Sequence, residues 1–167
     1  HRYYTRFWKQ SAQLCDFRWP DFLNLYGPKM TGVTGIAEQR FFNDVTGKNF
    51  SFLDGINLGK KIWNLDNAIW TLQGRHRDMV KFADYIYTKP STTPSGYPEY
   101  MPGIKNGKWD YVITSGRHFD SDQFEDFKTR FYRFQGWNEK TGCPARKTLE
   151  SIGLDNVADE LEKNGKT

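Results

Sequence analysis

The sequence predicts a mostly α-helical fold that also contains one long Pro/Gly loop and one small hairpin. Two observations carry this prediction: apolar residues recur at three- and four-residue spacing through most of the chain, and glycine or proline ends these segments. The chain has 167 residues, of which 37% are hydrophobic and 26% charged. That length and composition suit one domain with a buried core, so we expect residues 1–167 to form a single helical domain.

Two helices are expected before residue 50. Residues 1–14 carry a broad apolar stripe, and Trp19-Pro20 excludes a continuing helix because proline restricts the residue before it. Glycines and a proline punctuate a loop over residues 27–35. Residues 36–45 then form a predicted helix, with Gly47 just beyond its end.

The strongest helical signal follows Ser51. Ser51 is a predicted N-cap with Asp54 three residues later, which is a variant of the capping box, and Gly74 closes the helix. We expect the apolar side chains of this helix to face the core and the polar ones to face solvent. The predicted core face is Ile56, Gly59, Ile62, Trp63, Leu65, Ile69 and Leu72, and the predicted polar face is Lys60, Lys61, Asn64, Asp66 and Asn67.

The middle of the chain combines a short helix with a long loop. The helix is expected over residues 78–87, before Pro90. Prolines and glycines make a loop from Ser91 to Gly107, and a loop of this length usually has a function or covers something. Asn106-Gly107, set between apolar residues, predicts a small hairpin.

Two further helical segments are expected near the C-terminus. Asp120 begins the first, with Gln123 three residues later, and Gly136 ends it. Pro144 lies near the first turn of the second segment, where its missing N–H is tolerated. The predicted packing faces are Phe124, Phe127, Phe131 and Phe134 in the first and Leu149, Ile152 and Leu154 in the second.

Charge and composition exclude several classes of function. The net charge is +4 with both signs interspersed, which gives no footprint for nucleic acid. No apolar run approaches the roughly 18 to 20 residues of a membrane helix, and no signal peptide is visible, so we expect a cytoplasmic protein without a membrane partner. The chain begins at His1 rather than Met, from which we expect that a start was lost or processed.

The two cysteines are too few for a disulfide scaffold, and the three histidines show no ligand spacing. A lone cysteine such as Cys15, at a helix end, is most often a small buried hydrophobic residue. Cys143 is interpreted as a packing residue.

The basic residues Arg75, His76 and Arg77 suit a solvated or interdomain patch, and less often a contact to an acidic partner or a cofactor phosphate. Aromatic residues reach 17%, and those between Trp8 and Trp19 suit either a substrate funnel or, the preferred interpretation, packing against further domains.

Three segments in this order resemble the C-terminal region of the aldehyde:ferredoxin oxidoreductase family. They are KQSAQLCDF at Lys9–Phe17, GKKIWNLDNAIWTLQGRHRD at Gly59–Asp78 and FYRFQGWNEKTGCPARKTLESIGL at Phe131–Leu154. The resemblance implies the C-terminal helical domain of a tungstopterin oxidoreductase, as a fragment of a larger catalytic subunit. It implies a [4Fe-4S] cluster and a tungsten (or molybdenum) bis-pterin as cofactors. The chain alone is then not expected to be catalytically competent, and no residue in it is assigned as catalytic.

The same resemblance implies roles for three residues. Cys15 stands where the family has its fourth cluster ligand, and a thiolate there would bind iron. Leu14 would contact the pterin through its backbone. Gln10 stands where the family usually has a pterin-binding aspartate, so its contact to the pterin would be made without a charge.

The implied reaction is oxidation of aldehydes to carboxylic acids in an anaerobic setting. Electrons would pass to ferredoxin or to an iron–sulfur electron-transfer subunit, and the rest of the catalytic subunit would be the other partner. Three alternatives stay open: a fragment like the catalytic subunit of class II benzoyl-CoA reductase, a non-enzymatic aromatic-rich binding module, and a structural subunit of a larger complex.

Overall fold

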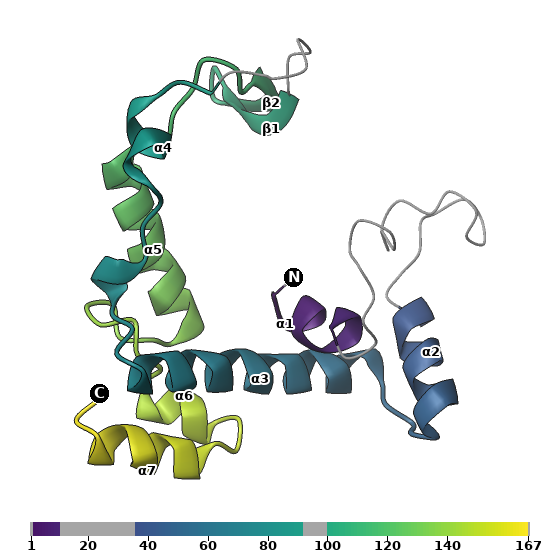
Figure 1. Cartoon of the computed structure of the whole chain (residues 1–167). Coiled ribbons are helices and arrows are strands. Elements are labelled where there is room, and N and C mark those ends of the chain that lie inside the picture. The colour runs from purple at the N-terminus through teal and green to yellow at the C-terminus, as the bar shows by residue number, and fades with distance from the viewer. Residues whose placement is uncertain (1, 11–35, 92–99, 167) are drawn as a thin grey trace.

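A long central helix organises the fold. In the computed structural model, residues 2–10, 36–91 and 100–166 are described. Helix α3 (Phe52–Leu72) is the base on which the other elements are arranged (Figure 1). The N-terminal segment lies on its first half and α2 (Ile36–Thr46) stands beyond that end, whereas α6 (Arg146–Glu150) and α7 (Asp155–Lys163) lie beneath its second half. The mostly α-helical prediction is confirmed.

The first two predicted helices are present in the described residues, with one difference. Helix α1 (Arg2–Tyr4) continues as a π-helix, η1 (Thr5–Lys9), where an α-helix was expected. The remainder of the predicted 1–14 helix lies outside the described residues. Helix α2 ends as predicted, because Gly47 adopts a φ of 68° that closes it.

The predicted start of α3 is confirmed by its hydrogen bonds. The Asp54 amide donates to Ser51 Oγ over 3.1 Å, and the Ser51 amide donates to the Asp54 carboxylate over 2.8 Å. This reciprocal pair is a complete capping box. The hydrogen bonds from Ser51 also hold the pKa of the Asp54 carboxyl below its usual range.

The predicted core face of α3 is confirmed at Gly59 and Trp63, which are buried, and is wrong at its C-terminal end. Ile69 and Leu72 are 44% and 38% exposed, whereas Asn64 and Asn67 are buried. Both asparagines are buried because their amides find partners: Trp137 Nε1 donates to Asn64 Oδ1 over 2.8 Å, and Asn67 Nδ2 donates to the Gly142 carbonyl over 2.8 Å. The segment after α5 thus packs on a polar stripe, since paired polar groups can be buried without a large penalty.

This correction makes an opposite prediction for two substitutions. Asn67→Ala should lower the free energy of unfolding by about 1 to 3 kcal/mol, because the buried Gly142 carbonyl loses its donor. Ile69→Ala should change it by less than about 1 kcal/mol, because nearly half of the Ile69 side chain already faces solvent. Urea unfolding of both variants measures the difference, and a larger effect at Ile69 would contradict the buried polar stripe.

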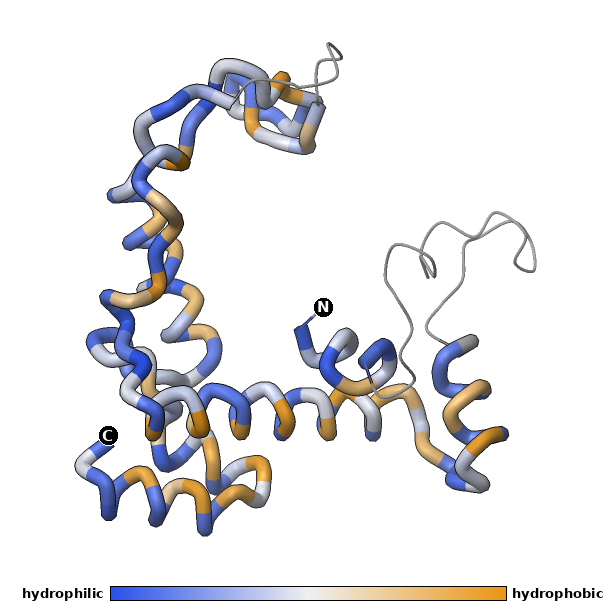
Figure 2. The backbone as a smooth tube through the Cα atoms, viewed as in Figure 1, coloured by the Kyte–Doolittle hydropathy of each residue, from blue (hydrophilic) through white to orange (hydrophobic). Residues whose placement is uncertain are grey.

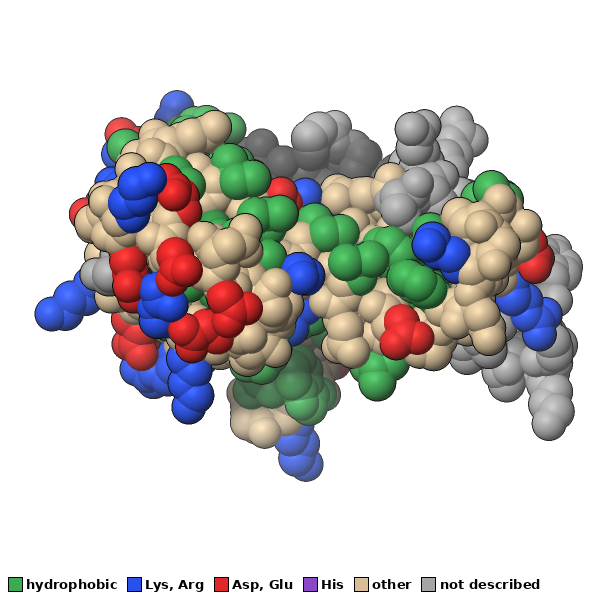
Figure 3. All heavy atoms as spheres, turned by 90° about the horizontal axis from the view of Figure 1, so that it is seen from below, with side chains coloured by type: hydrophobic (Ala, Val, Ile, Leu, Met, Phe, Trp, Pro, Cys, Tyr) green, Lys and Arg blue, Asp and Glu red, His purple; other side chains and the backbone are tan. Residues whose placement is uncertain are grey.

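The C-terminal core lies between α3, α6 and α7. Leu149 is fully buried there and Leu154 is 6% exposed, as predicted, and both pack with Ala68 of α3. Hydrophobic positions of α7 lie on its side nearer to α3, with hydrophilic ones on the far side (Figure 2). Acidic and basic side chains gather over this end of the molecule in the view from below (Figure 3). Arg146 accounts for part of this charge, because it forms ion pairs with Glu150, Asp159 and Glu162.

A separate arm rises from the end of α3. It contains the 3₁₀ turn η3 (Arg77–Met79), α4 (Asp84–Thr88) and α5 (Ser121–Gln135), with a hairpin of β1 (Tyr100–Lys105) and β2 (Lys108–Ile113) at its far end (Figure 1). The predicted helix over 78–87 is therefore reduced to α4 and the η3 turn. The predicted hairpin is confirmed.

The predicted phenylalanine core of α5 is wrong for two of its four residues. Phe127 and Phe134 are 54% and 79% exposed, whereas Lys128 is buried and its Nζ donates to the Val80 carbonyl over 2.9 Å. The segment that precedes α4 packs on this polar side of α5. The other two phenylalanines do pack: Phe124 lies against Phe82 with ring centroids 5.0 Å apart, and Phe131 packs against the buried cluster that contains Trp137.

The hairpin has one entirely apolar face. Asn106 and Gly107 take φ values of 54° and 76°, which suit the two-residue turn that the sequence predicted. The antiparallel register places alternate residues of the two strands on the same face. That face carries Tyr100, Pro102, Ile104, Trp109, Tyr111 and Ile113, all of them exposed.

None of the described helices has both the length and the apolar character that crossing a membrane requires.

Candidate functional site

The N-terminal helical segment is seated on two glycines of α3. A Cβ atom at Gly59 would lie 1.9 Å from the Tyr3 carbonyl oxygen, and one at Gly55 would lie 2.1 Å from Trp8 Cε2. Both separations are far below van der Waals contact, so only glycine allows this approach. The two glycines thus fix how closely residues 2–10 lie against the helix.

Trp8 anchors this segment in an aromatic cluster. It is 1% exposed, and its Nε1 donates to the Phe52 carbonyl over 3.1 Å. Its ring stacks on Phe52 with a centroid separation of 6.1 Å and an interplanar angle of 7°. Phe7 extends the cluster to Phe42 of α2, with centroids 5.1 Å apart. The segment is therefore held between α2 and α3.

Arg6 joins the segment to α3 and also holds Gln10. It forms an ion pair with Asp66 at 3.2 Å and lies over the Trp63 ring, 5.1 Å from its centroid. Its Nη1 also donates to Gln10 Oε1 over 3.3 Å. Gln10 is exposed, and its backbone amide completes the π-helical turn by donating to the Thr5 carbonyl. Among the described residues the Gln10 amide nitrogen donates no hydrogen bond, so with respect to these residues it is available as a donor.

Lys9, which directly precedes Gln10 in the sequence, forms a buried ion pair with Glu38 of α2. The Lys9 Nζ lies 3.1 Å from Glu38 Oε1, and the two side chains are 2% and 0% exposed. The pair connects η1 to the first turn of α2. The Lys9 ammonium also lies 5.7 Å from the centroid of the Tyr4 ring.

Of the three predicted site residues, the described structure contains Gln10. Leu14 and Cys15 lie outside the described residues, so their predicted roles stay predictions. The close packing of residues 2–10 on Gly55 and Gly59 was not predicted, because Gly59 was expected only as a member of the core face. The four-residue spacing of Gly55 and Gly59 places both glycines on one side of the helix. Together with the aromatic-rich segment before it, this spacing could have predicted that another stretch of backbone lies close to α3.

Cys143 is a packing residue, as predicted. It is 1% exposed and lies in the cluster with Leu149 and Ala158. Burial raises the pKa of its thiol, with a smaller opposing effect from a hydrogen bond with Thr71. A buried thiol of raised pKa is a poor metal ligand, because metal binding needs the thiolate.

The predicted solvated basic patch is wrong at Arg77. Its Nη1 donates to the Glu139 carbonyl over 2.6 Å, and its Nη2 pairs with the Glu125 carboxylate at 2.9 Å. Arg77 thus fastens η3 to α5 and to the loop that follows α5. His76 is exposed and lies 3.2 Å from Asp78.

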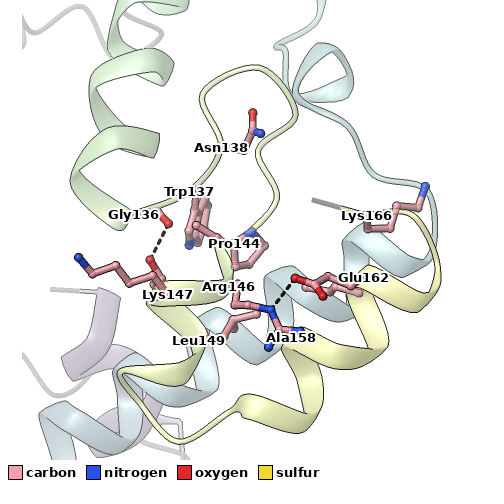
Figure 4. Close-up of a pocket in the computed structure, with 13 residues that line it drawn as sticks. Gly136, Trp137, Asn138, Pro144, Arg146, Lys147, Leu149, Ala158, Glu162 and Lys166 are labelled. Atoms are coloured by element: carbon pink, nitrogen blue, oxygen red, sulfur yellow. Dashed lines mark hydrogen bonds and ion pairs between the residues drawn. The ribbon is translucent and has the colours of Figure 1, made fainter.

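A hollow lies at the other end of the molecule, between the loop after α5 and helices α6 and α7 (Figure 4). Its volume is about 470 Å³, and Trp137, Pro144, Leu149 and Ala158 line it with the side chains of Arg146 and Lys166 near its edge. The Arg146 guanidinium is occupied by carboxylates, including Glu162. Within the described ranges no group of three or more His, Cys, Asp or Glu side chains is placed to hold a metal ion.

A family model agrees with the resemblance seen in the three sequence segments. The model described as aldehyde ferredoxin oxidoreductase, domains 2 & 3, matches residues 4–154 of the chain. The match begins at the segment seated on Gly55 and Gly59 and ends at Leu154, in the C-terminal core.

Proposed function

Because this chain belongs to the aldehyde ferredoxin oxidoreductase family, we propose that it forms part of a tungsten- or molybdenum-pterin enzyme that oxidises aldehydes to carboxylic acids. Electrons would leave through a [4Fe-4S] cluster to ferredoxin or to an iron–sulfur partner subunit. The observation that carries the proposal is the family match over residues 4–154, which includes the seated N-terminal segment. The match favours this enzyme over a carbohydrate- or peptide-binding module.

The cysteines of the chain suit a contribution of one ligand to such a cluster. A [4Fe-4S] cluster needs four thiolates, and the chain contains two cysteines. Cys143 is committed to the core, which leaves Cys15 as the single candidate. The other ligands would come from outside residues 1–167. This supports a larger catalytic subunit, in which the chain alone is not competent.

The residues of the described segment would orient the cofactors. When bound, the pterin-held metal and the cluster supply the redox chemistry, and the protein positions and insulates them. Arg6 holds the Gln10 oxygen, so the Gln10 amide would present its N–H donors outward, toward the pterin. Leu14 would contribute its backbone. The buried side chains of Phe7 and Trp8 would support this segment from below.

Cys15→Ser in the full-length enzyme is the direct test. We expect loss of most cluster iron, because an alkoxide is a poorer donor to iron than a thiolate. Cys143→Ala is the matched control and should leave iron per protein unchanged. Iron analysis and the visible absorbance of the purified enzyme provide the measurement. Full iron content in the Cys15 variant would overturn the assignment.

The reaction and its acceptor need a separate assay. Aldehyde-dependent reduction of ferredoxin by the purified full-length enzyme, with carboxylic acid as the product, is the expected result. A cytoplasmic location belongs to the same proposal. An enzyme that contains pterin and iron but reduces an aromatic thioester instead would favour the benzoyl-CoA reductase alternative.

A further inference from the structure

Arg6 contacts both α3 and the side chain of Gln10. Its Nη1 lies 3.2 Å from Asp66 Oδ2 and donates to Gln10 Oε1 over 3.3 Å. Its guanidinium also lies over the Trp63 ring, 5.1 Å from the centroid. Trp63 and Asp66 are three residues apart on α3, so they are neighbours on one side of that helix. The position of the Gln10 amide thus depends on an arginine that α3 holds.

Asp66 supplies the charge that holds Arg6. An arginine side chain has several rotatable bonds and loses much conformational entropy when it is fixed in one position. The Trp63 ring attracts the guanidinium but gives its N–H groups no single partner atom. The Asp66 carboxylate adds a fixed charge at 3.2 Å, which favours the guanidinium position in which Nη1 also reaches Gln10.

The Arg6–Asp66 ion pair contributes little to folding stability. The two side chains are 22% and 30% exposed, and water screens an ion pair of such exposure. Among the described residues Asp66 pairs with Arg6 alone. Removal of the Asp66 carboxylate should therefore leave the fold intact and change mainly the placement of Arg6.

The contact with Arg6 determines which group of the Gln10 amide is free. A glutamine amide carries one oxygen acceptor and two N–H donors, whereas arginine can only donate. Arg6 therefore takes the amide oxygen and leaves the amide nitrogen, which donates no hydrogen bond among the described residues. Gln10 then presents donors to a ligand, where an ionised aspartate at the same position could only accept.

We propose that Asp66 is a positioning residue of the pterin site, which holds Arg6 so that Gln10 donates a hydrogen bond to an acceptor atom of the cofactor. The inference rests on the proposed function, because that function places the pterin against Gln10. Loss of one such hydrogen bond should weaken cofactor retention by about two- to tenfold.

The rate at which the full-length enzyme releases pterin, followed by the fluorescence of the oxidised pterin, tests this inference. Asp66→Ala should release pterin about two- to tenfold faster at an unchanged thermal midpoint. Gln10→Ala should have a similar effect, and D66A should add nothing in the Q10A background, because Asp66 acts through Gln10. Asp66→Glu keeps the charge and should bring the rate back toward the wild-type value. Asp126→Ala is the matched control, because it removes an ion pair with Arg130 on another helix and should leave the rate unchanged.

The variants also define what would overturn the inference. A wild-type release rate in a folded D66A enzyme would do so. A D66A effect of equal size in the wild-type and Q10A backgrounds would do so as well, since Asp66 would then act by a route other than Gln10. If D66A does not fold, D66N replaces it, because asparagine keeps the side-chain shape and removes the charge. Faster release from D66N supports the inference, and wild-type release contradicts it.

A purified wild-type enzyme without pterin would instead overturn the proposed function. The positioning of Gln10 would then be tested in the cofactor-free protein by the NMR signals of the Gln10 side-chain amide, with nitrogen-15 introduced at the glutamine side chains. A shift of these signals in D66A but not in D126A would support the role of Asp66. Unchanged signals in D66A would contradict it.

Discussion

Gly59→Ala is expected to push the N-terminal segment away from α3 and to lower the free energy of unfolding by about 2 to 3 kcal/mol. The added Cβ would lie 1.9 Å from the Tyr3 carbonyl oxygen, and a backbone atom cannot yield as the end of a flexible side chain can. The gain in helix propensity on replacing glycine by alanine, about 1 kcal/mol, offsets only part of this overlap. Urea unfolding and limited proteolysis near residue 10 measure the two consequences.

Asn57→Ala is the matched control for Gly59→Ala. Asn57 lies on the same helix two residues earlier and is exposed, so alanine there should be neutral or slightly stabilising. In the full-length enzyme, Gly59→Ala should also reduce cluster iron, because it displaces the segment that leads to Cys15. A Gly59→Ala variant as stable and protease-resistant as Asn57→Ala would show that the segment is not seated on α3.

Trp8→Ala should lower the free energy of unfolding by about 3 to 5 kcal/mol. The side chain is 1% exposed, so its removal leaves a large cavity between Phe7 and Phe52, and the Phe52 carbonyl loses its donor. Chemical denaturation followed by circular dichroism measures the change. Trp109→Ala is the control, because Trp109 is 78% exposed and its removal should have little effect on global stability. Equal losses in the two variants would contradict the anchoring role of Trp8.

Helix ends and turns could be predicted from the sequence because they depend on local chemistry. Ser51 and Asp54 form their capping box within one turn, and Asn106-Gly107 sets the hairpin without help from distant residues. Core faces were harder to predict. Asn64 and Asn67 are buried only because Trp137 and Gly142, more than seventy residues away, supply their partners. The assumption that polar side chains face solvent fails where such pairing occurs.

The same reasoning applies to the candidate site. The resemblance identified Gln10 from a local segment, but Lys9 and Glu38 carried no signal as a pair because twenty-eight residues separate them in the sequence. Gly59 was visible only as a small residue on an amphipathic helix. Its function follows from the Tyr3 carbonyl that lies against it, a contact that no spacing within α3 indicates.

The apolar face of the hairpin has a consequence for how this protein is made. A two-stranded hairpin without a covered face is only marginally stable in water, so β1 and β2 should open and close continually in an isolated chain and exchange their amide hydrogens rapidly. Their open strand edges and the aromatic pair Trp109 and Tyr111 would then promote self-association at high concentration. We therefore expect the hairpin to promote association of newly synthesised chains, and replacing Trp109 and Tyr111 by lysine and threonine should reduce that association.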